Sequence, residues 1–227
     1  NSLSGITANA QIRKAISLAC DRTVFAQSAY NGYATAATSP FNPQASIAQN
    51  VKIFSSEADS ITAKQALNQS MIDSKKLKIN ILVNKNNNRI ACATLLKNQL
   101  EAIGFTVTID EEGTKEYTRR VKNTEFNLYI GEVKLSDDMC LYPFFDDKSG
   151  GVRYGIHNEN LTCDDLYSAY LAGECDLGKF ILAFNEEMPY IPLVYKKGMI
   201  CYTKAMSGDM QGYWGNFFSN IDTWRFE

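Results

Sequence analysis

The centre of the sequence switches repeatedly between the residue spacing of a strand and that of a helix. Alternating apolar and polar residues predict strands over 77–84, 105–110 and 125–131. Apolar residues at helical spacing predict a helix over 86–104, and a shorter helix is predicted over 114–123. A β-α-β-α-β succession predicts a mixed, mostly parallel sheet with right-handed crossovers and helices on both faces. The sequence therefore predicts the α/β class.

The ends of the predicted strands indicate where a ligand would bind. In sheets of this kind, ligands gather at the carboxyl ends of the strands. Those ends lead here into the segments that begin at Asn84, Asp110 and Gly131. We therefore expect a binding site along this edge.

The first helix is predicted over residues 10–25. Its apolar stripe consists of Ile12, Ala15, Ile16 and Ala19. Asn9 is the expected N-cap, because its side chain can accept from the first free backbone N–H groups. Arg13 and Arg22 fall off the stripe.

Shorter patterns predict the remaining elements. The glycine, proline, asparagine and serine content of residues 31–50 indicates an irregular loop. Further elements are expected as helices over 57–69, 163–173 and 175–188, and as two strands about a Lys-Lys-Gly turn over 190–203.

Charge and hydropathy exclude some classes of protein. The chain has 227 residues, with 23 basic and 25 acidic side chains spread along it and a net charge of -2. This distribution makes no basic stripe, so nucleic acid is not an expected partner. No apolar run approaches the ~20 residues that span a bilayer, and the first residues carry no signal-peptide pattern.

The cysteine and histidine content gives no metal motif. Six cysteines include no C-x-x-C pair, and His157 is the only histidine. A zinc site is therefore not expected, and His157 is interpreted as a surface residue in a loop. Cys20 and Cys92 are expected to be small buried residues.

Seven segments resemble, in order, those of a known family. They are IRKAISLACDR at 12–22, GYATAATSPFNP at 32–43, AKQALNQS at 63–70, LKINILVN at 77–84, LLKNQLEAIGFTVTI at 95–109, EFNLYIG at 125–131 and MPYIPLVY at 188–195. In this order the chain resembles the second lobe of the family 5 extracellular solute-binding proteins. These serve oligopeptide, dipeptide and nickel ABC importers.

The resemblance implies a fold, a role and partners. It implies that residues 1–227 form one domain with a type II periplasmic-binding fold, the C-terminal lobe of a two-lobe protein whose first lobe is missing here. The implied role is to deliver peptides or similar small solutes to the permease subunits of an ABC importer. The implied location is extracellular or periplasmic, with a lipoprotein anchor on the full-length protein. No cofactor and no catalysis are implied.

The same resemblance indicates which residues face the ligand. The family places an aromatic and an acidic residue after the strand that corresponds to 125–131, and the acid pairs with a peptide amino terminus. Asp137 or Asp138 could supply this carboxylate, and Glu132 stands where the family usually has Trp. Alternatively, the two aspartates cap the next turn or lie in solvent. Lys134 could pair with a ligand carboxylate or be simply solvated.

Aromatic residues and cysteines mark the region after 140. Tyr142 and Tyr154, with Phe144 and Phe145, form either a pocket lining or core beneath a long loop. Cys140 and Cys163 bracket this region, and a disulfide between them would stiffen it. Cys163 with Cys175 is the competing pair.

Two other functions remain open on the sequence. One is a non-catalytic protein-interaction domain on the same fold. The other is a carboxylate-dependent hydrolase that uses Asp137 and Asp138, although neighbouring residues usually point in different directions. The sequence contains no nucleophile elbow, metalloprotease motif or glycine-rich phosphate loop.

Overall fold

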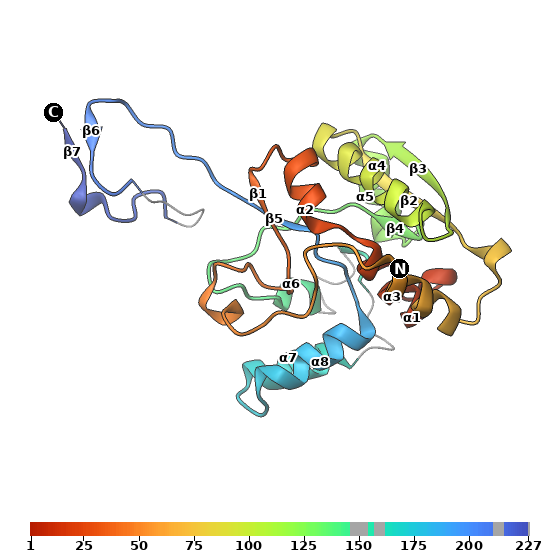
Figure 1. Ribbon diagram of the computed structural model, residues 1–227. Helices are drawn as coiled ribbons and strands as arrows, with labels where there is room; N and C mark the ends of the chain where they lie inside the picture. Colours follow the sequence, from red (N-terminus) through yellow and green to blue (C-terminus); the bar gives the residue numbers. More distant parts are fainter. Residues whose placement is uncertain (146–153, 157–161, 211–215, 227) are drawn as a thin grey trace.

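A three-stranded parallel sheet lies on one side of the molecule, at the right in Figure 1. The computed structural model describes residues 1–145, 154–156, 162–210 and 216–226. The strands are β2 (Lys78–Asn84), β3 (Thr106–Glu112) and β4 (Leu128–Tyr129), and their order is β3-β2-β4. Parallel pairing sets Lys78 opposite Thr106 and Ile81 opposite Leu128. The predicted α/β class and parallel sheet are confirmed.

Helices cover both faces of this sheet, as predicted. They are α4 (Asn87–Glu101) and α5 (Thr114–Lys122), which follow β2 and β3. Ile79, Ile81 and Val83 of β2 pack into the main core with α4. Leu82 points to the opposite face, where it packs against Val121 of α5. Side chains that alternate along one strand therefore bury both faces.

Two further helices complete the main core. They are α1 (Ala10–Ala19) and α3 (Ser60–Gln69). The predicted stripe of α1 is buried, and the Asn9 side chain accepts a hydrogen bond from the Gln11 N–H at 2.9 Å. The single helix predicted over 10–25 is wrong, because Cys20 is extended and a new turn begins there. The Asp21 side chain caps that turn by accepting from the Val24 N–H at 2.9 Å.

Two arginines of this first segment are buried. Exposed fractions are 6% for Arg13 and 1% for Arg22. Arg13 donates to the main-chain carbonyls of Ala8 at 2.7 Å and Met188 at 3.1 Å. Arg22 donates to the carbonyls of Pro192 at 2.9 Å and Ser17 at 3.1 Å. Carbonyl acceptors satisfy the guanidinium groups, so residues that lie off the apolar stripe can still be core.

The segment after the break runs through α2 (Arg22–Val24) and a π-helix (Phe25–Ala29) into β1 (Ala34–Ala36). β1 pairs antiparallel with β5 (Val194–Lys196), with Ala34 opposite Lys196. The hairpin predicted over 190–203 is therefore wrong. The residues after β5 form no strand until β6, and β5 pairs with a strand from the start of the chain.

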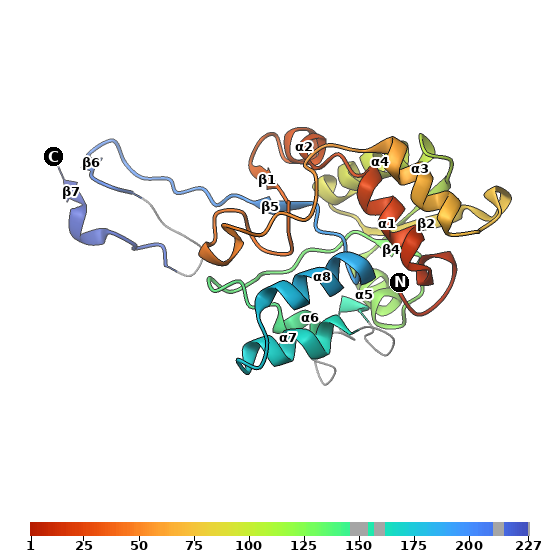
Figure 2. The ribbon, with the colours of Figure 1, turned by 60° about the horizontal axis from the view of Figure 1, so that its bottom comes forward.

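A second core lies beside the sheet, below it in Figure 2. Its helices are α6 (Tyr142–Phe145), α7 (Cys163–Leu171) and α8 (Leu177–Glu187). The Asp176 side chain caps α8 by accepting from the Lys179 N–H at 3.3 Å. Met188 ends α8 in a left-handed conformation, before Pro189.

The C-terminal residues leave the body of the molecule. In both ribbon views the chain after β5 extends away from both cores as an arm. The arm carries the strands β6 (Met206–Ser207) and β7 (Arg225–Phe226), which pair antiparallel, and the 3-10 helix Ile221–Thr223. Further 3-10 helices in the described part of the chain include Ile6–Ala8, Ser46–Ala48 and Ser74–Lys76. Among the described residues, no helix has the length and apolarity needed to cross a membrane.

Candidate functional site

The carboxyl ends of the three parallel strands meet at one edge of the sheet. The N–H of Lys85, just past β2, donates to the Glu112 carbonyl at the end of β3 at 3.0 Å. The N–H of Ile130, just past β4, donates to the Leu82 carbonyl at 3.0 Å. α4 begins at this edge, where the Asn86 side chain accepts from the Arg89 N–H at 3.1 Å. The edge therefore gathers three strand ends and the positive end of a helix dipole.

Four polar side chains converge here, and we call them the edge cluster: Asn84, Arg89, Glu132 and Lys196. The Lys196 Nζ lies 2.7 Å from Glu132 Oε1. The Arg89 Nη2 lies 3.4 Å from Glu132 Oε2, and its Nη1 donates to Asn84 Oδ1 at 3.1 Å. Glu132 thus bridges a cation from α4 and a cation from β5.

The surroundings of the edge cluster hold Glu132 ionised. Partial burial acts to raise the pKa of Glu132, but the hydrogen bonds and charges of Lys196 and Arg89 outweigh it, and the pKa lies below its ordinary value. Two tyrosines lie beside the arginine. Burial raises the pKa of Tyr117 to about 12 against the opposing effect of Arg89. Burial likewise raises the pKa of Tyr30, so both phenols are neutral hydrogen-bonding groups.

One donor of Arg89 has no acceptor. The Arg89 Nε is buried and makes no hydrogen bond. The side chain as a whole is 19% exposed, whereas those of Glu132 and Lys196 are 43% and 48% exposed. The arginine is therefore held at the base of the cluster, and its two partners lie toward solvent.

Of the other residues predicted to face a ligand, the acidic pair is not part of the edge cluster. The Asp138 carboxylate accepts from Ser136 Oγ at 2.6 Å and from the Cys140 N–H at 3.0 Å. It therefore caps a turn, which was the alternative interpretation of this residue. Asp137 and Lys134 are exposed, and a ligand contact of either residue stays a prediction.

The aromatic residues after 140 form core for the most part. Phe144 and Phe145 are buried, and Phe144 stacks on Tyr190 with ring centroids 4.5 Å apart. Tyr154 is half-buried, with its ring 5.4 Å from that of Phe144. Tyr142 is 50% exposed at the start of α6. The core interpretation therefore holds for the two phenylalanines, and a ligand contact of Tyr142 or Tyr154 stays a prediction.

All six cysteines are free thiols in the structure. The expected bridge between Cys140 and Cys163 is therefore not formed. The buried Cys163 thiol lies beside the carboxylate of Glu187, and both this burial and Glu187 raise its pKa. Cys140 lies beside the Tyr167 hydroxyl instead. Whether oxidation joins the pair stays a prediction, which mass spectrometry of the unreduced protein tests.

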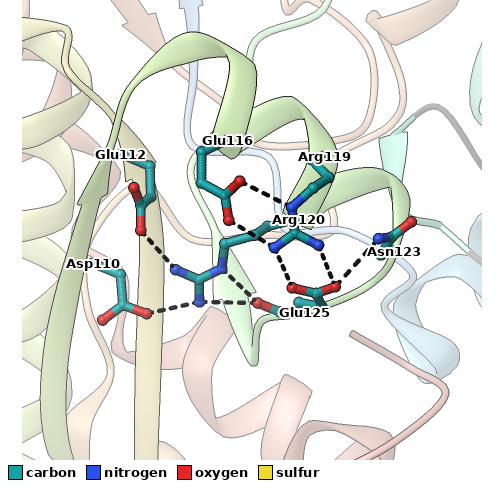
Figure 3. Close-up of polar contacts among 7 residues, drawn as sticks. All are labelled: Asp110, Glu112, Glu116, Arg119, Arg120, Asn123 and Glu125. Atoms are coloured by element: carbon teal, nitrogen blue, oxygen red, sulfur yellow. Dashed lines mark hydrogen bonds and ion pairs between the residues drawn. The ribbon is translucent and has the colours of Figure 1, made fainter.

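A second group of charges lies on the β3–α5 side of the sheet (Figure 3), and we call it the α5 network: Asp110, Glu112, Glu116, Arg119, Arg120, Asn123 and Glu125. Arg120 donates to Asp110 at 2.8 Å and to Glu112 at 3.3 Å. Arg119 binds Glu116 at 2.6 Å and Glu125 at 2.7 Å. The sequence predicted the end of this strand at Asp110, but β3 continues to Glu112, and both carboxylates bind Arg120 and fasten α5 to β3.

A shallow depression lies elsewhere, between α1, residues 53–59 and the end of α8. Arg22 lines it, but its guanidinium is engaged with main-chain carbonyls and lies 4.8 Å from the ring centre of Phe54. Within the described part of the chain, no three His, Cys, Asp or Glu side chains are grouped as metal ligands. His157 lies outside the described residues. The edge cluster is therefore the candidate site.

Sequence and fold comparisons agree with this architecture. The structure is a lobe of the type II periplasmic-binding fold. Residues 1–150 match the family model described as bacterial extracellular solute-binding proteins, family 5 Middle. The chain belongs to this family, which consists of binding proteins. Among curated proteins, no sequence matches the chain.

Three solved structures illustrate the likeness. The oligopeptide-binding protein AppA of Bacillus subtilis, solved with a nonapeptide, has a TM-score of 0.71 and 19% identity, over 100% of this chain and 49% of that chain. NikZ of Campylobacter jejuni, solved with Ni(L-His), has a TM-score of 0.70 and 18% identity, over 99% of this chain and 50% of that chain. HbpA2 of Haemophilus parasuis has a TM-score of 0.73 and 18% identity, over 92% of this chain and 43% of that chain. This likeness is one of fold, and the chain spans half or less of each of these three proteins.

The sequence identified only part of the edge cluster. Glu132 was among the predicted ligand-facing residues, and Asn84 marked a strand end. Arg89 was missed, although it lies in the first turn of the helix that follows that strand. Lys196 was missed because it was assigned to a turn, whereas it ends β5. A search that covered each strand end and the first turn of the helix that follows it would have included Arg89.

Proposed function

We propose that residues 1–227 form the C-terminal lobe of a two-lobe binding protein that delivers peptides or similar small solutes to an ABC importer. The observation that carries this proposal is the edge cluster, in which polar side chains converge at the carboxyl edge of the sheet. Membership of the solute-binding family supports the role. The first lobe would close over the same edge.

The arm supports the proposal of a missing lobe. It exposes large apolar side chains on Met199, Tyr202, Phe217, Phe218, Ile221 and Phe226. An exposed apolar surface of this kind usually marks an interaction surface. The lengths are consistent with a missing lobe, since the chain covers 43% to 50% of the three related structures.

Binding rather than catalysis is the proposed activity. The two aspartates that a hydrolase would use do not form a carboxylate pair, because Asp138 caps a turn and Asp137 is exposed. We place the intact protein outside the cytoplasmic membrane, anchored as a lipoprotein and in contact with permease subunits. This location and these partners rest on the family alone.

A thermal-shift screen of the intact gene product tests the proposal. Pools of short peptides, nickel complexes and sugars are added separately, and a bound ligand stabilises the protein by RT ln(1 + [L]/Kd). We expect a concentration-dependent rise in Tm with the peptide pool. A rise only with nickel complexes or only with sugars would assign the solute to that class instead of to peptides. No rise with any class would favour a protein-interaction domain.

A further inference from the structure

The turn between α3 and β2 projects from the body of the molecule at the end opposite the arm, at the far right in Figure 1 and Figure 2. It consists of residues 70–77 and includes the 3-10 helix Ser74–Lys76. Because β2 begins just after it, the turn lies at the amino end of the sheet, away from the carboxyl edge that holds the edge cluster. The proposed closure of a first lobe over the carboxyl edge therefore leaves this turn in solvent.

Met71 lies in this turn in a conformation that is unfavourable for its residue type. Its side chain is 94% exposed, and its φ is 57°, in the left-handed region that glycine and asparagine adopt more readily. Its neighbours hold it there, since the Ser70 Oγ donates to the Leu67 carbonyl at 2.6 Å and Ile72 packs against the main core. The turn therefore presents a large apolar side chain to solvent at a position that suits asparagine better.

The same segment is positively charged. Residues 64–78 contain four lysines and one acidic residue, Asp73, so their net charge is +3, whereas that of the whole chain is -2. At the neighbouring end of α4, Glu101 pairs with Lys97 at 3.8 Å and leaves this balance unchanged. The four lysines are exposed, and none of them forms an ion pair within the described part of the chain: Lys64, Lys75, Lys76 and Lys78.

An exposed methionine beside several lysines matches the chemistry of an anionic membrane surface. Lysines close to such a surface are attracted to the phosphate headgroups, and an apolar side chain adds to the binding by entering the boundary between headgroups and acyl chains. A stable protein interface uses about 20–30 residues on each side, many more than this turn offers. The size and the charge of the turn therefore favour a lipid surface over a protein partner.

We propose that residues 64–78 form a membrane-contacting surface, in which the lysines bind anionic phospholipid headgroups and Met71 enters the layer beneath them. The inference rests on the proposed location of the intact protein outside the membrane, and not on the identity of its solute. Contacts of this kind are weak alone, but the proposed lipid anchor would keep the surface near the membrane at a high effective concentration. The surface would then fix the orientation of the lobe on the membrane.

Co-sedimentation with lipid vesicles tests this surface on the full chain. One set of vesicles contains equal parts of phosphatidylglycerol and phosphatidylcholine, and the other contains phosphatidylcholine alone. We expect binding to the anionic vesicles only, and a loss of binding as the salt concentration is raised. The double variant Lys75→Gln with Lys76→Gln should bind roughly 30-fold more weakly, since each lysine near such a surface contributes about fivefold. The matched control is Lys115→Gln with Lys122→Gln, which removes two exposed lysines from α5 and should leave binding unchanged.

A substitution of Met71 separates membrane contact from folding. Met71→Asn suits the left-handed backbone better, so the melting temperature should not fall. Its affinity for the anionic vesicles should fall by roughly tenfold, because one apolar side chain no longer leaves water. The control is Met199→Asn, which removes a methionine that is 73% exposed in the arm and should leave vesicle binding unchanged.

Three results would overturn the inference. The first is the absence of binding to the anionic vesicles, which would favour a protein partner for this surface. The second is equal weakening by the two pairs of lysine substitutions, because the attraction would then not depend on residues 64–78. The third is wild-type affinity in Met71→Asn. None of these results affects the thermal-shift screen, which tests the proposed function separately.

Discussion

The α5 network and the edge cluster use the same kinds of side chain with opposite charge balance. In the α5 network, Arg119 and Arg120 lie among four carboxylates, and their hydrogen bonds to these carboxylates are all 3.3 Å or shorter. In the edge cluster, one carboxylate serves two cations, and its contact to Arg89 is 3.4 Å long. The arginines of the α5 network are paired with carboxylates, whereas in the edge cluster the Arg89 Nε makes no hydrogen bond.

The difference indicates separate roles. Arg120 is only 16% exposed and joins α5 to β3, so its contacts fasten two elements of the fold. Arg89 is similarly shielded at 19%, but its buried Nε makes no hydrogen bond. A buried donor without a partner is costly and calls for an explanation. The binding of a ligand at this edge of the sheet, as proposed above, would account for it.

The largest expected effect is that of Arg120→Ala. This variant removes contacts to Asp110 and Glu112 and leaves their carboxylates facing one another. We expect the free energy of unfolding to fall by about 2 kcal/mol. Urea denaturation measures this change. A loss well below this value would mean that the α5 network does not fasten the helix.

A smaller, pH-dependent effect is expected for Glu132→Gln. The pKa of Glu132 is lowered in the folded protein, so its ionisation adds stability above the unfolded pKa of about 4.3, and this is lost as pH falls through the folded value. The wild type should exceed the variant by less than about 1 kcal/mol at pH 7. The gap should close toward pH 3. A gap independent of pH between 7 and 3 would contradict the ion pairing of Glu132.

The smallest effect is expected for Arg119→Gln. Arg119 is 47% exposed, and its partners Glu116 and Glu125 are each 44% exposed. Ion pairs at this exposure are screened by solvent and contribute little to stability, so the melting temperature should change little. Ligand affinity should not change at all. If Glu132→Gln changed neither the melting temperature nor the ligand affinity, the distinction between the edge cluster and the α5 network would be lost.

The sequence predicted the elements whose signal is local. The parallel sheet and α4 follow from apolar spacing within each segment, and Gly104, which follows α4, has a positive φ of 114°. The pairing of β1 with β5 joins residues from opposite ends of the chain, such as Ala34 and Lys196, and leaves no local pattern. The turn residues after Lys196 therefore suggested a hairpin that does not form.

The site was less predictable than the fold for the same reason. Glu132 and the strand end at Asn84 could be found from segment order alone. Arg89 becomes significant only when Glu132 lies beside it, and the two are 43 residues apart. The burial of Arg13 and Arg22 likewise depends on carbonyls from the end of α8 and the segment after it. Such contacts require the tertiary structure.

Photo-crosslinking tests most directly whether the carboxyl edge receives the ligand. The probe is a tetraalanine with one residue replaced by a benzophenone amino acid, applied to the intact gene product and located by mass spectrometry. We expect crosslinks to residues 84–89 and 131–134, and we expect an excess of unlabelled tetraalanine with a free carboxyl group to suppress them. Crosslinks confined to α5 or to α7 and α8 would contradict it.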